Sequence, residues 1–271
     1  MNFYAIGPIA AVLDAAYAVL HNLTLFLTPF AAANAAALAI VVVTVALRLL
    51  LVPVGVSQAR AQQVRQRLAP RLAQLRRLHG NSPERLQRET AALYAAENAS
   101  PLAGCLPLLV QAPILSIVYG LFVLADINGH DNALLAGGLF GSPLGTSILT
   151  GWGTGQDAAT LHVGVGVLAA LLLAQLLSRR LMLAQGAAAA GLAATVNPAV
   201  PTPPAAAGLP PAAQATMTRA FSWLPLISVV FAAFVPLAAA VYLTVSALWS
   251  VSERALLWRM MRKGAEPTRA S

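Results

Sequence analysis

The single cysteine of the chain, Cys105, lies in the stretch "NASPLAGCLPLLVQAPILSIVYG", which begins at Asn98. Three kinds of chemistry come into question: a lipid anchor at "LAGC", a reactive thiolate, or a metal ligand. No histidine lies near it, and lipoprotein processing follows an N-terminal signal rather than a mid-chain segment. The sequence therefore favours a small packing residue in an apolar helix, and it predicts no catalytic residue, metal site or cofactor.

Arg48 is a stronger candidate for function, because it is the only formal charge inside any expected membrane span. It lies about 12 Å from the nearer end of its span, counted by helical rise. A buried charge at this depth costs at least ~2.5–3.5 kcal/mol unless water or polar groups compensate it. Snorkelling of the long side chain towards the membrane surface is the structural alternative. Otherwise, Arg48 predicts a hydrated cavity.

Other polar side chains in the apolar segments are suited to line such a cavity. Thr44 lies one turn before Arg48, and Tyr242, Ser246 and Ser250 repeat at a spacing that puts them on one helix face. The predicted groove residues are Arg48, Thr44, Gln111, Gln175, Tyr242, Ser246 and Ser250. Each could instead only join neighbouring helices. No acid lies within the spans and no histidine lies within the span of Arg48, so a groove that hydrates a passing polypeptide fits better than a proton relay.

The composition indicates a membrane protein. Hydrophobic residues make up 58% of the chain and charged residues only 10%, against about a quarter charged in soluble domains. The net charge of +8 could suggest nucleic acid, but its distribution predicts topology instead. Arginines gather in three polar segments, whereas the segment 126–160 has Asp126, Asp131 and Asp157 and no Arg or Lys. The positive-inside rule places the basic segments in the cytoplasm and the acidic one outside, with no direct nucleic-acid function.

Five membrane-spanning segments are expected. They are 35–56, 102–124, 161–178, 220–235 and 237–251. The last two come from one apolar block that is too long for a single crossing of a ~30 Å core. Both flanks of this block are basic, so the number of crossings should be even, and Pro236 provides a turn. The N-terminus is then outside and the C-terminus, with a tail over 263–271, is cytoplasmic.

The residues before the first span are apolar but interrupted by Asp14, His21 and Asn22. Apolar residues at helical spacing favour an interfacial helix on the outer face over 1–30. A sixth span is the competing interpretation, and it would put the N-terminus in the cytoplasm.

Two amphipathic segments between the first two spans predict a cytoplasmic helical hairpin over 57–98. Its first stripe consists of Val64, Leu68, Leu72, Leu75 and Leu78. Gly80 suits a helix end, and Ser82, Pro83 and Glu84 suit a helix start. The basic surface could set topology and attract anionic lipids, or it could dock polypeptides. Further on, the Ala/Pro-rich stretch 187–218 is expected to form a flexible cytoplasmic loop.

The strings "RLLLVPVGVSQAR" from Arg48 and "LYAAENASPLAGCLPLLVQAPILSIVYGLF" from Leu93 resemble the YidC/Oxa family of membrane protein insertases. The positions that match the family pattern are Pro53, Gln58, Gly104, Cys105, Leu106, Pro107, Gln111, Pro113 and Tyr119. The last two spans are also similar to the C-terminal pair of the family. Ser100, Leu243 and Ala247 depart from the usual residues, which marks a divergent member of the family, and the string "FGSPLG" in the outer loop is typical of an actinobacterial member.

The resemblance implies an all-α, five-span insertase core over 31–262 in the bacterial plasma membrane. Arg48 matches the groove arginine of the family and Gln175 its groove glutamine. The implied activity is to receive nascent membrane proteins in a groove open to cytoplasm and lipid and release them into the bilayer. The implied partners are these nascent chains, the Sec translocon, the ribosome and anionic lipids.

Two other classes of function compete with this one. A small-solute transporter or channel would need an aqueous path with charged groups near the midplane, for which Arg48 alone is thin support. An intramembrane enzyme would need a reactive constellation, and no HExxH string, paired Asp or Ser–His arrangement lies within the spans.

Overall fold

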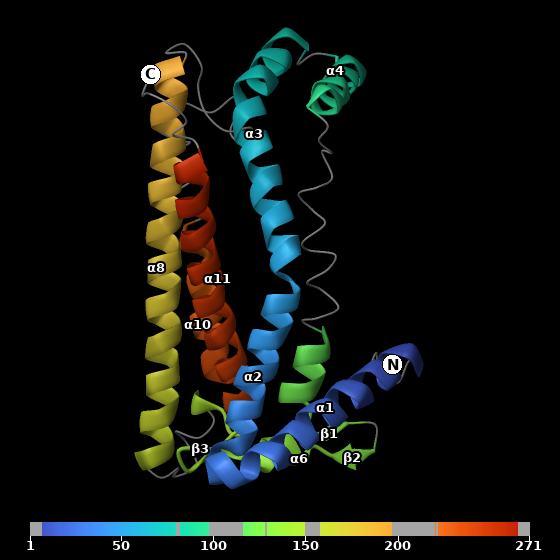
Figure 1. Cartoon of the computed structure of the whole chain (residues 1–271), viewed down its shortest axis with the longest axis vertical. Helices are drawn as coiled ribbons and strands as arrows, with labels where there is room; N and C mark the ends of the chain where they lie inside the picture. Colours follow the sequence, from blue (N-terminus) through green and yellow to red (C-terminus); the bar gives the residue numbers. More distant parts are fainter. Residues whose placement is uncertain are drawn as a thin grey trace. The chain divides into compact units, whose positions relative to one another are not determined.

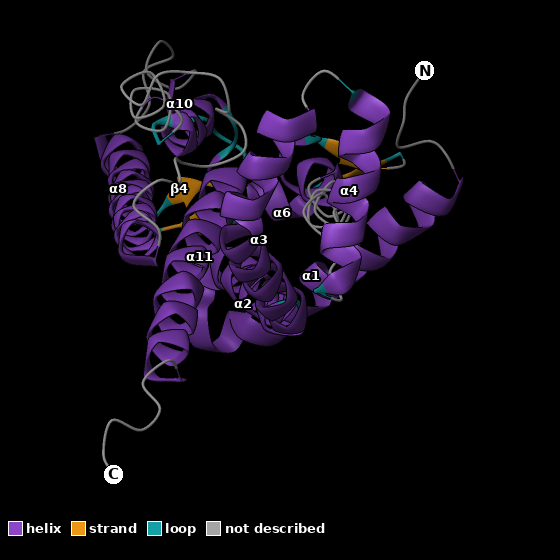
Figure 2. Cartoon of the chain, turned by 90° about the horizontal axis from the view of Figure 1, so that it is seen from above, coloured by secondary structure: helices purple, strands orange, loops and turns teal. Residues whose placement is uncertain are grey.

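The structure, a computed structural model, describes residues 7–79, 82–97, 116–127, 129–149, 158–196, 220 and 222–264. Helix is the main class of secondary structure in these residues, and strands are confined to two short hairpins (Figure 2). The chain divides into two compact units. The first contains Met1–Leu51, Gln111–Ser178 and Pro225–Ala255, and the second Val52–Val110, Arg179–Leu224 and Leu256–Ser271. All predicted groove residues belong to the first unit.

The first unit begins with α1 (Gly7–Ala31), a short 3₁₀ turn η2 (Ala32–Asn34) and α2 (Ala35–Leu50). The chain turns at Ala32, whose φ is +45°, so α1 runs obliquely to α2 (Figure 1). The buried Leu13 and Leu20 of α1 belong to the main apolar cluster of the unit. The stretch Gly7–Leu50 contains a segment that is long and apolar enough to cross a membrane. Whether α1 lies on the membrane or spans it therefore stays a prediction.

The first expected span, 35–56, does not form one uninterrupted helix. α2 ends at Leu50, and α3 (Val52–His79) begins after a break at Leu51. Pro53 explains the break, because it has no N–H to donate to the carbonyl of Leu49.

The second unit contains the two helices of the basic segment, α3 and α4 (Pro83–Ala96). They pack through Leu68, Leu72 and Tyr94, which form an apolar cluster of their own. Leu78 is exposed, so the expected stripe is buried only in part. Pro83 occupies the first turn of α4 as expected, but Ser82 makes no side-chain capping bond. Gly80 lies outside the described residues.

The segment before α8 is tied together by Asn132. Residues 116–123 are helical, and β1 (Asp126–Ile127) pairs with β2 (His130–Asp131). Then follow α6 (Ala133–Ala136) and the pair β3 (Gly138–Leu139) and β4 (Ser142–Pro143). The Asn132 amide donates to the carbonyls of Leu121 and Leu124 over 2.7 and 2.9 Å, and its Oδ1 accepts from the N–H of Leu134. The remainder of the expected span 102–124, including Cys105 and Gln111, lies outside the described residues.

The third expected span is part of a much longer helix, α8 (Ala158–Val196). Its stretch Thr160–Ala184 is apolar enough to cross a membrane. The expectation of a flexible loop from residue 187 needs correction, because 187–196 are helical. The alanine-rich sequence explains this, since alanine has the highest helix propensity. Residues 197–219 of the expected loop lie outside the described part of the chain.

The last apolar block divides at Pro236, as its sequence predicts. A 3₁₀ turn, η5 (Leu224–Leu226), leads into α10 (Ile227–Phe234), and α11 (Leu237–Gly264) follows. The apolar helix Leu224–Phe234 is about 16 Å long by helical rise, shorter than the expected 220–235. The N–H groups of Leu237 and Ala238 donate to the carbonyls of Thr146 and Leu144, both over 2.9 Å. The start of α11 is thus fixed to the segment that follows β4.

Candidate functional site

Ile40, Thr44 and Arg48 lie on one face of α2, and their burial decreases from the apolar core towards the end of the helix. Ile40 is fully buried in the core cluster, Thr44 is buried one turn further on, and Arg48 is half-buried after one more turn. The Thr44 hydroxyl donates to the carbonyl of Ile40 over 2.6 Å, so its hydrogen is already used within the helix. Arg48 therefore carries the donors of this face that are suited to bind another molecule.

A second polar face lies on α11 and contains Tyr242, Ser246 and Ser250. Tyr242 and Ser246 are buried, and Ser250 is half-buried. The ring of Tyr242 packs against that of Phe122, with centroids 6.1 Å apart. The hydroxyl of Ser250 donates to the carbonyl of Ser246 over 2.9 Å. Tyr242 is thus part of the apolar core, and the polar character of this face begins with Ser246.

The polar residues of α2 and α11 lie at matching depths. One loop segment contacts both helices near their first residues. Gly137 lies so close to Ala36 of α2 that it has no room for a side chain, and the nearby carbonyl of Leu144 accepts from the N–H of Ala238 of α11. Ala36 and Ala238 are therefore the reference points for depth. Both helices run the same way from this segment (Figure 1). Counted by helical rise, Thr44 and Ser246 each follow these points by about 12 Å. Arg48 and Ser250 each follow them by about 18 Å.

The predicted groove residue Gln175 bonds to a neighbouring helix of the first unit. Its amide donates to the hydroxyl of Ser228 in α10 over 2.8 Å, and Ser228 donates in turn to the carbonyl of Pro225 over 2.7 Å. The bond joins α8 to α10, which is the helix-joining role that polar residues often have in membranes. Ser228 was not singled out from the sequence, although a lone serine in an apolar run was a usable signal.

Two buried oxygen atoms on α11 have no hydrogen-bond partner in the described part of the chain. They are Oγ of Ser246 and Oε1 of Glu253. The other carboxylate oxygen of Glu253 accepts from Nε1 of Trp249 over 3.2 Å. Buried polar atoms without protein partners are usually bound by water. This end of α11 thus has the chemistry of a hydrated surface.

Two arginines near the end of the apolar part of α8 and α11 also bind hydroxyl groups. Arg254 of α11 donates to the hydroxyl of Ser178 over 3.2 Å. Within the second unit, Arg179 donates through Nε to the hydroxyl of Ser222 over 3.1 Å, and its guanidinium lies 4.0 Å from the ring centroid of Trp223. No group of three His, Cys, Asp or Glu side chains that could hold a metal occurs among the described residues.

Residues 27–264 of the chain match the family described as the 60Kd inner membrane protein, which is the family of the YidC/Oxa insertases. The chain belongs to this family. The match covers the whole of α2, α8, α10 and α11, so the polar faces of α2 and α11 lie within the matched region. The resemblance found in the strings from Arg48 and Leu93 is therefore confirmed.

Several bacterial relatives are similar over shorter stretches. "Membrane protein insertase YidC" of Clostridium perfringens is 41% identical over 75 residues, which cover 27% of this chain and 32% of the relative. The protein of the same name from Dechloromonas aromatica is 48% identical over 52 residues, 19% of this chain and 10% of the relative. The matched stretches thus span a third or less of these relatives.

Proposed function

We propose that this protein is a membrane protein insertase of the bacterial plasma membrane. The polar part of a nascent chain enters a hydrated groove formed by the inner faces of α2 and α11, while its apolar part passes into the bilayer. Membership of the family and the names of the relatives support the activity. The observation that carries the groove is the match in depth between Arg48 on α2 and the serine hydroxyls on α11.

The physical basis is compensation of polar groups inside a low-dielectric region. A polar peptide segment that leaves water without new hydrogen bonds costs several kcal/mol per group. The half-buried guanidinium of Arg48 offers donors to peptide carbonyls, and Ser246 holds a buried oxygen without a partner among the described residues. Water and these groups together lower the barrier for the polar segment, and no nucleotide is required.

We also propose the topology and the partners. The chain crosses the membrane five times, with the N-terminus outside and α3 and α4 in the cytoplasm. Nascent membrane proteins are the clients, alone or with the Sec translocon. The exposed arginines on α3 and α4, including Arg60, Arg85 and Arg88, are suited to meet ribosomes or anionic lipid headgroups.

The experiment uses the purified full chain in proteoliposomes and an in vitro translated single-span protein as the client. Insertion is measured by protease protection of the client. We expect Arg48→Ala to lower insertion several-fold, Arg48→Lys to retain most of it, and Arg180→Ala, an exposed arginine on α8, to leave it unchanged. A photo-crosslinker at Ser246 should capture the client in the wild type and lose it with Arg48→Ala.

Two outcomes contradict the proposal. Wild-type insertion by Arg48→Ala shows that the guanidinium has no part in the groove. Loss of Arg48→Ala from the membrane fraction, with Arg48→Lys also lost, shows a structural role instead.

A further inference from the structure

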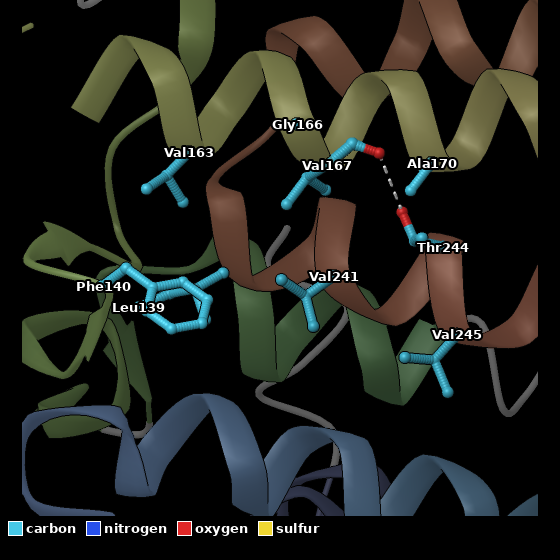
Figure 3. Close-up of a pocket in the computed structure, with 9 residues that line it drawn as sticks. All are labelled: Leu139, Phe140, Val163, Gly166, Val167, Ala170, Val241, Thr244 and Val245. Carbon is cyan, nitrogen blue, oxygen red and sulfur yellow. Dashed lines mark hydrogen bonds between the residues drawn. The ribbon is translucent and has the colours of Figure 1, made fainter. Parts of the chain in front are cut away.

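An apolar pocket lies between α8, α11 and the hairpin of β3 and β4 (Figure 3). Its volume is about 330 Å³, within the range of roughly 300–1,000 Å³ that small-molecule sites have. The pocket is formed entirely by the first unit. Its lining residues are Leu139, Phe140, Val163, Gly166, Val167, Ala170, Val241, Thr244 and Val245.

The lining offers almost nothing to a polar ligand. Thr244 has the only polar side chain, and its hydroxyl donates to the carbonyl of Ala240 over 2.8 Å. The carbonyl of Val167 lies 3.5 Å from the same oxygen (Figure 3). The hydroxyl hydrogen is therefore used within the protein, and the ligand must be recognised through apolar contact.

Small residues on α8 create the hollow. Val163, Val167 and Ala170 repeat at helical spacing on the lining face, and Gly166 lies beside them. A Cβ atom added at Gly166 would meet no atom within 4 Å, whereas one at Gly164 would approach Ile148 to 2.6 Å. Gly164 is thus a close-packing glycine, while Gly166 leaves space that no other part of the described chain fills.

The position of the pocket along α8 identifies its surroundings. The stretch Thr160–Ala184 is long and apolar enough to cross a membrane, and the lining residues of α8 lie about 5–15 Å from its beginning by helical rise. Nearby apolar side chains that face outward, Val165 at 53% and Leu173 at 68% exposure, are suited to contact lipid. The medium beside the pocket is then hydrocarbon near one membrane surface.

Phe140 is held at the pocket by its backbone. Its φ is +49°, a strained value for a bulky residue, and its N–H donates to Oδ1 of Asn34 over 2.6 Å. The side chain is 72% exposed. Phe140 lies at the Val163 end of the pocket (Figure 3), close to the beginning of the apolar stretch Thr160–Ala184, so it marks the end of the pocket nearer the membrane surface.

We propose that this pocket binds one acyl chain of a membrane phospholipid, through the part of the chain next to the headgroup. The apolar lining, the open space at Gly166 and the place along α8 carry the assignment. The bound chain fills a void between α8 and α11, and the side chains that line this void gain van der Waals contacts that they would otherwise lack. The proposal rests on membership of a membrane protein family and not on insertase activity.

The test uses the full chain in nanodiscs that contain a small fraction of phospholipid with a diazirine near the headgroup end of one acyl chain. After irradiation, labelled peptides are mapped by mass spectrometry. In the wild type we expect labelling concentrated in residues 163–170 and 241–245. Gly166→Leu, whose Cβ would meet no atom within 4 Å, places a larger side chain in the pocket and should reduce this labelling several-fold.

Val165→Leu is the matched control, because it enlarges the neighbouring outward-facing side chain and leaves the pocket open. Val245→Phe narrows the pocket from α11 and should reproduce the loss if Gly166→Leu does not fold. Equal labelling of the wild type and both pocket variants would overturn the proposal. Labelling that differs between phosphatidylglycerol and phosphatidylcholine would also overturn it, because recognition would then involve the headgroup. Capture of a translated client by the pocket in place of lipid would overturn it as well.

Discussion

Asn132 carries more structural weight than its place in a short loop suggests. Its side chain is buried and binds the carbonyls of Leu121 and Leu124 as well as the N–H of Leu134. We predict that Asn132→Ala lowers the free energy of unfolding by about 1–3 kcal/mol, because buried groups lose their partners. The measurement is thermal unfolding of the purified chain in detergent.

Asn132→Asp separates hydrogen bonding from packing at this position. The aspartate keeps the size but loses the two amide donors, and it places an acceptor beside two carbonyl oxygens. We expect it to destabilise the protein at least as much as alanine does. His130→Ala, an exposed neighbour, is the control and should leave the unfolding temperature unchanged. Wild-type stability of Asn132→Asp would contradict the role assigned to these bonds.

Gln175 has two competing roles that one set of variants can separate. If its bond to Ser228 is the whole of its role, Gln175→Leu and Ser228→Ala should each cost about 0.6 kcal/mol, a typical value for a bond between membrane helices. The double variant should then cost no more than one single variant, since both remove the same bond. If Gln175 also binds clients, Gln175→Leu alone should lower insertion in the proteoliposome assay while Ser228→Ala leaves it unchanged.

Single residues could be predicted from the sequence where chemistry alone makes them unusual. Arg48 stands out as a charge in an apolar run, and its half-buried position continues the buried face of Ile40 and Thr44. The partner of Gln175 could not be predicted, because it depends on the relative register of α8 and α10, which are far apart in the sequence. Likewise, nothing in the sequence alone distinguishes the tightly packed Gly164 from the open Gly166.

Prolines in the sequence predicted the breaks between helices well, whereas the ends of the helices were harder to predict. Pro236 separates α10 from α11, and Pro53 follows the break after α2. Helix ends were less predictable, since they depend on tertiary contacts and on propensity beyond the apolar run. α8 continues to Val196 through an alanine-rich stretch, although its apolar, membrane-length part ends at Ala184.

The start of α11 illustrates a contact that no local pattern contains. Val235 is extended, with φ −84° and ψ 160°, and after Pro236 the N–H groups of Leu237 and Ala238 donate to carbonyls of the 144–146 segment. The first turn of a helix lacks internal partners for its N–H groups. A distant loop provides them here, and the N–H of Leu144 in this loop donates to the carbonyl of Gly137, which lies against Ala36 near the start of α2. This shared attachment is what sets Arg48 and Ser250 at one depth.

The composition of the whole chain predicts a membrane protein. The orientation in the membrane is predicted from the distribution of charged residues along the sequence. Two described stretches, Gly7–Leu50 and Thr160–Ala184, are long and apolar enough to cross a membrane. The positive-inside rule adds the direction: arginine-rich segments in the cytoplasm, and the segment with Asp126 and Asp131 outside. This assignment can be tested directly, because the chain has only one native cysteine.

We predict the following labelling of single-cysteine variants built on Cys105→Ser. Asp131→Cys should react with a membrane-impermeant maleimide in intact spheroplasts, since its side chain is exposed on the proposed outer side. Arg88→Cys, exposed on α4, should react only after permeabilisation. The reverse pattern would contradict the topology, and reaction of both in intact cells would show that the membrane is not sealed.

Gly7→Cys decides between the two interpretations of α1 in the same experiment. Gly7 is exposed at the start of α1, and a side chain there meets no atom within 4 Å. An interfacial helix on the outer face keeps this residue outside, so it should react in intact spheroplasts at the rate of Asp131→Cys. A sixth span would carry it to the cytoplasm, and reaction would then require permeabilisation, as for Arg88→Cys. The turn at Ala32 and the oblique course of α1 favour the first result, because a helix that leaves α2 at such an angle can follow the membrane surface.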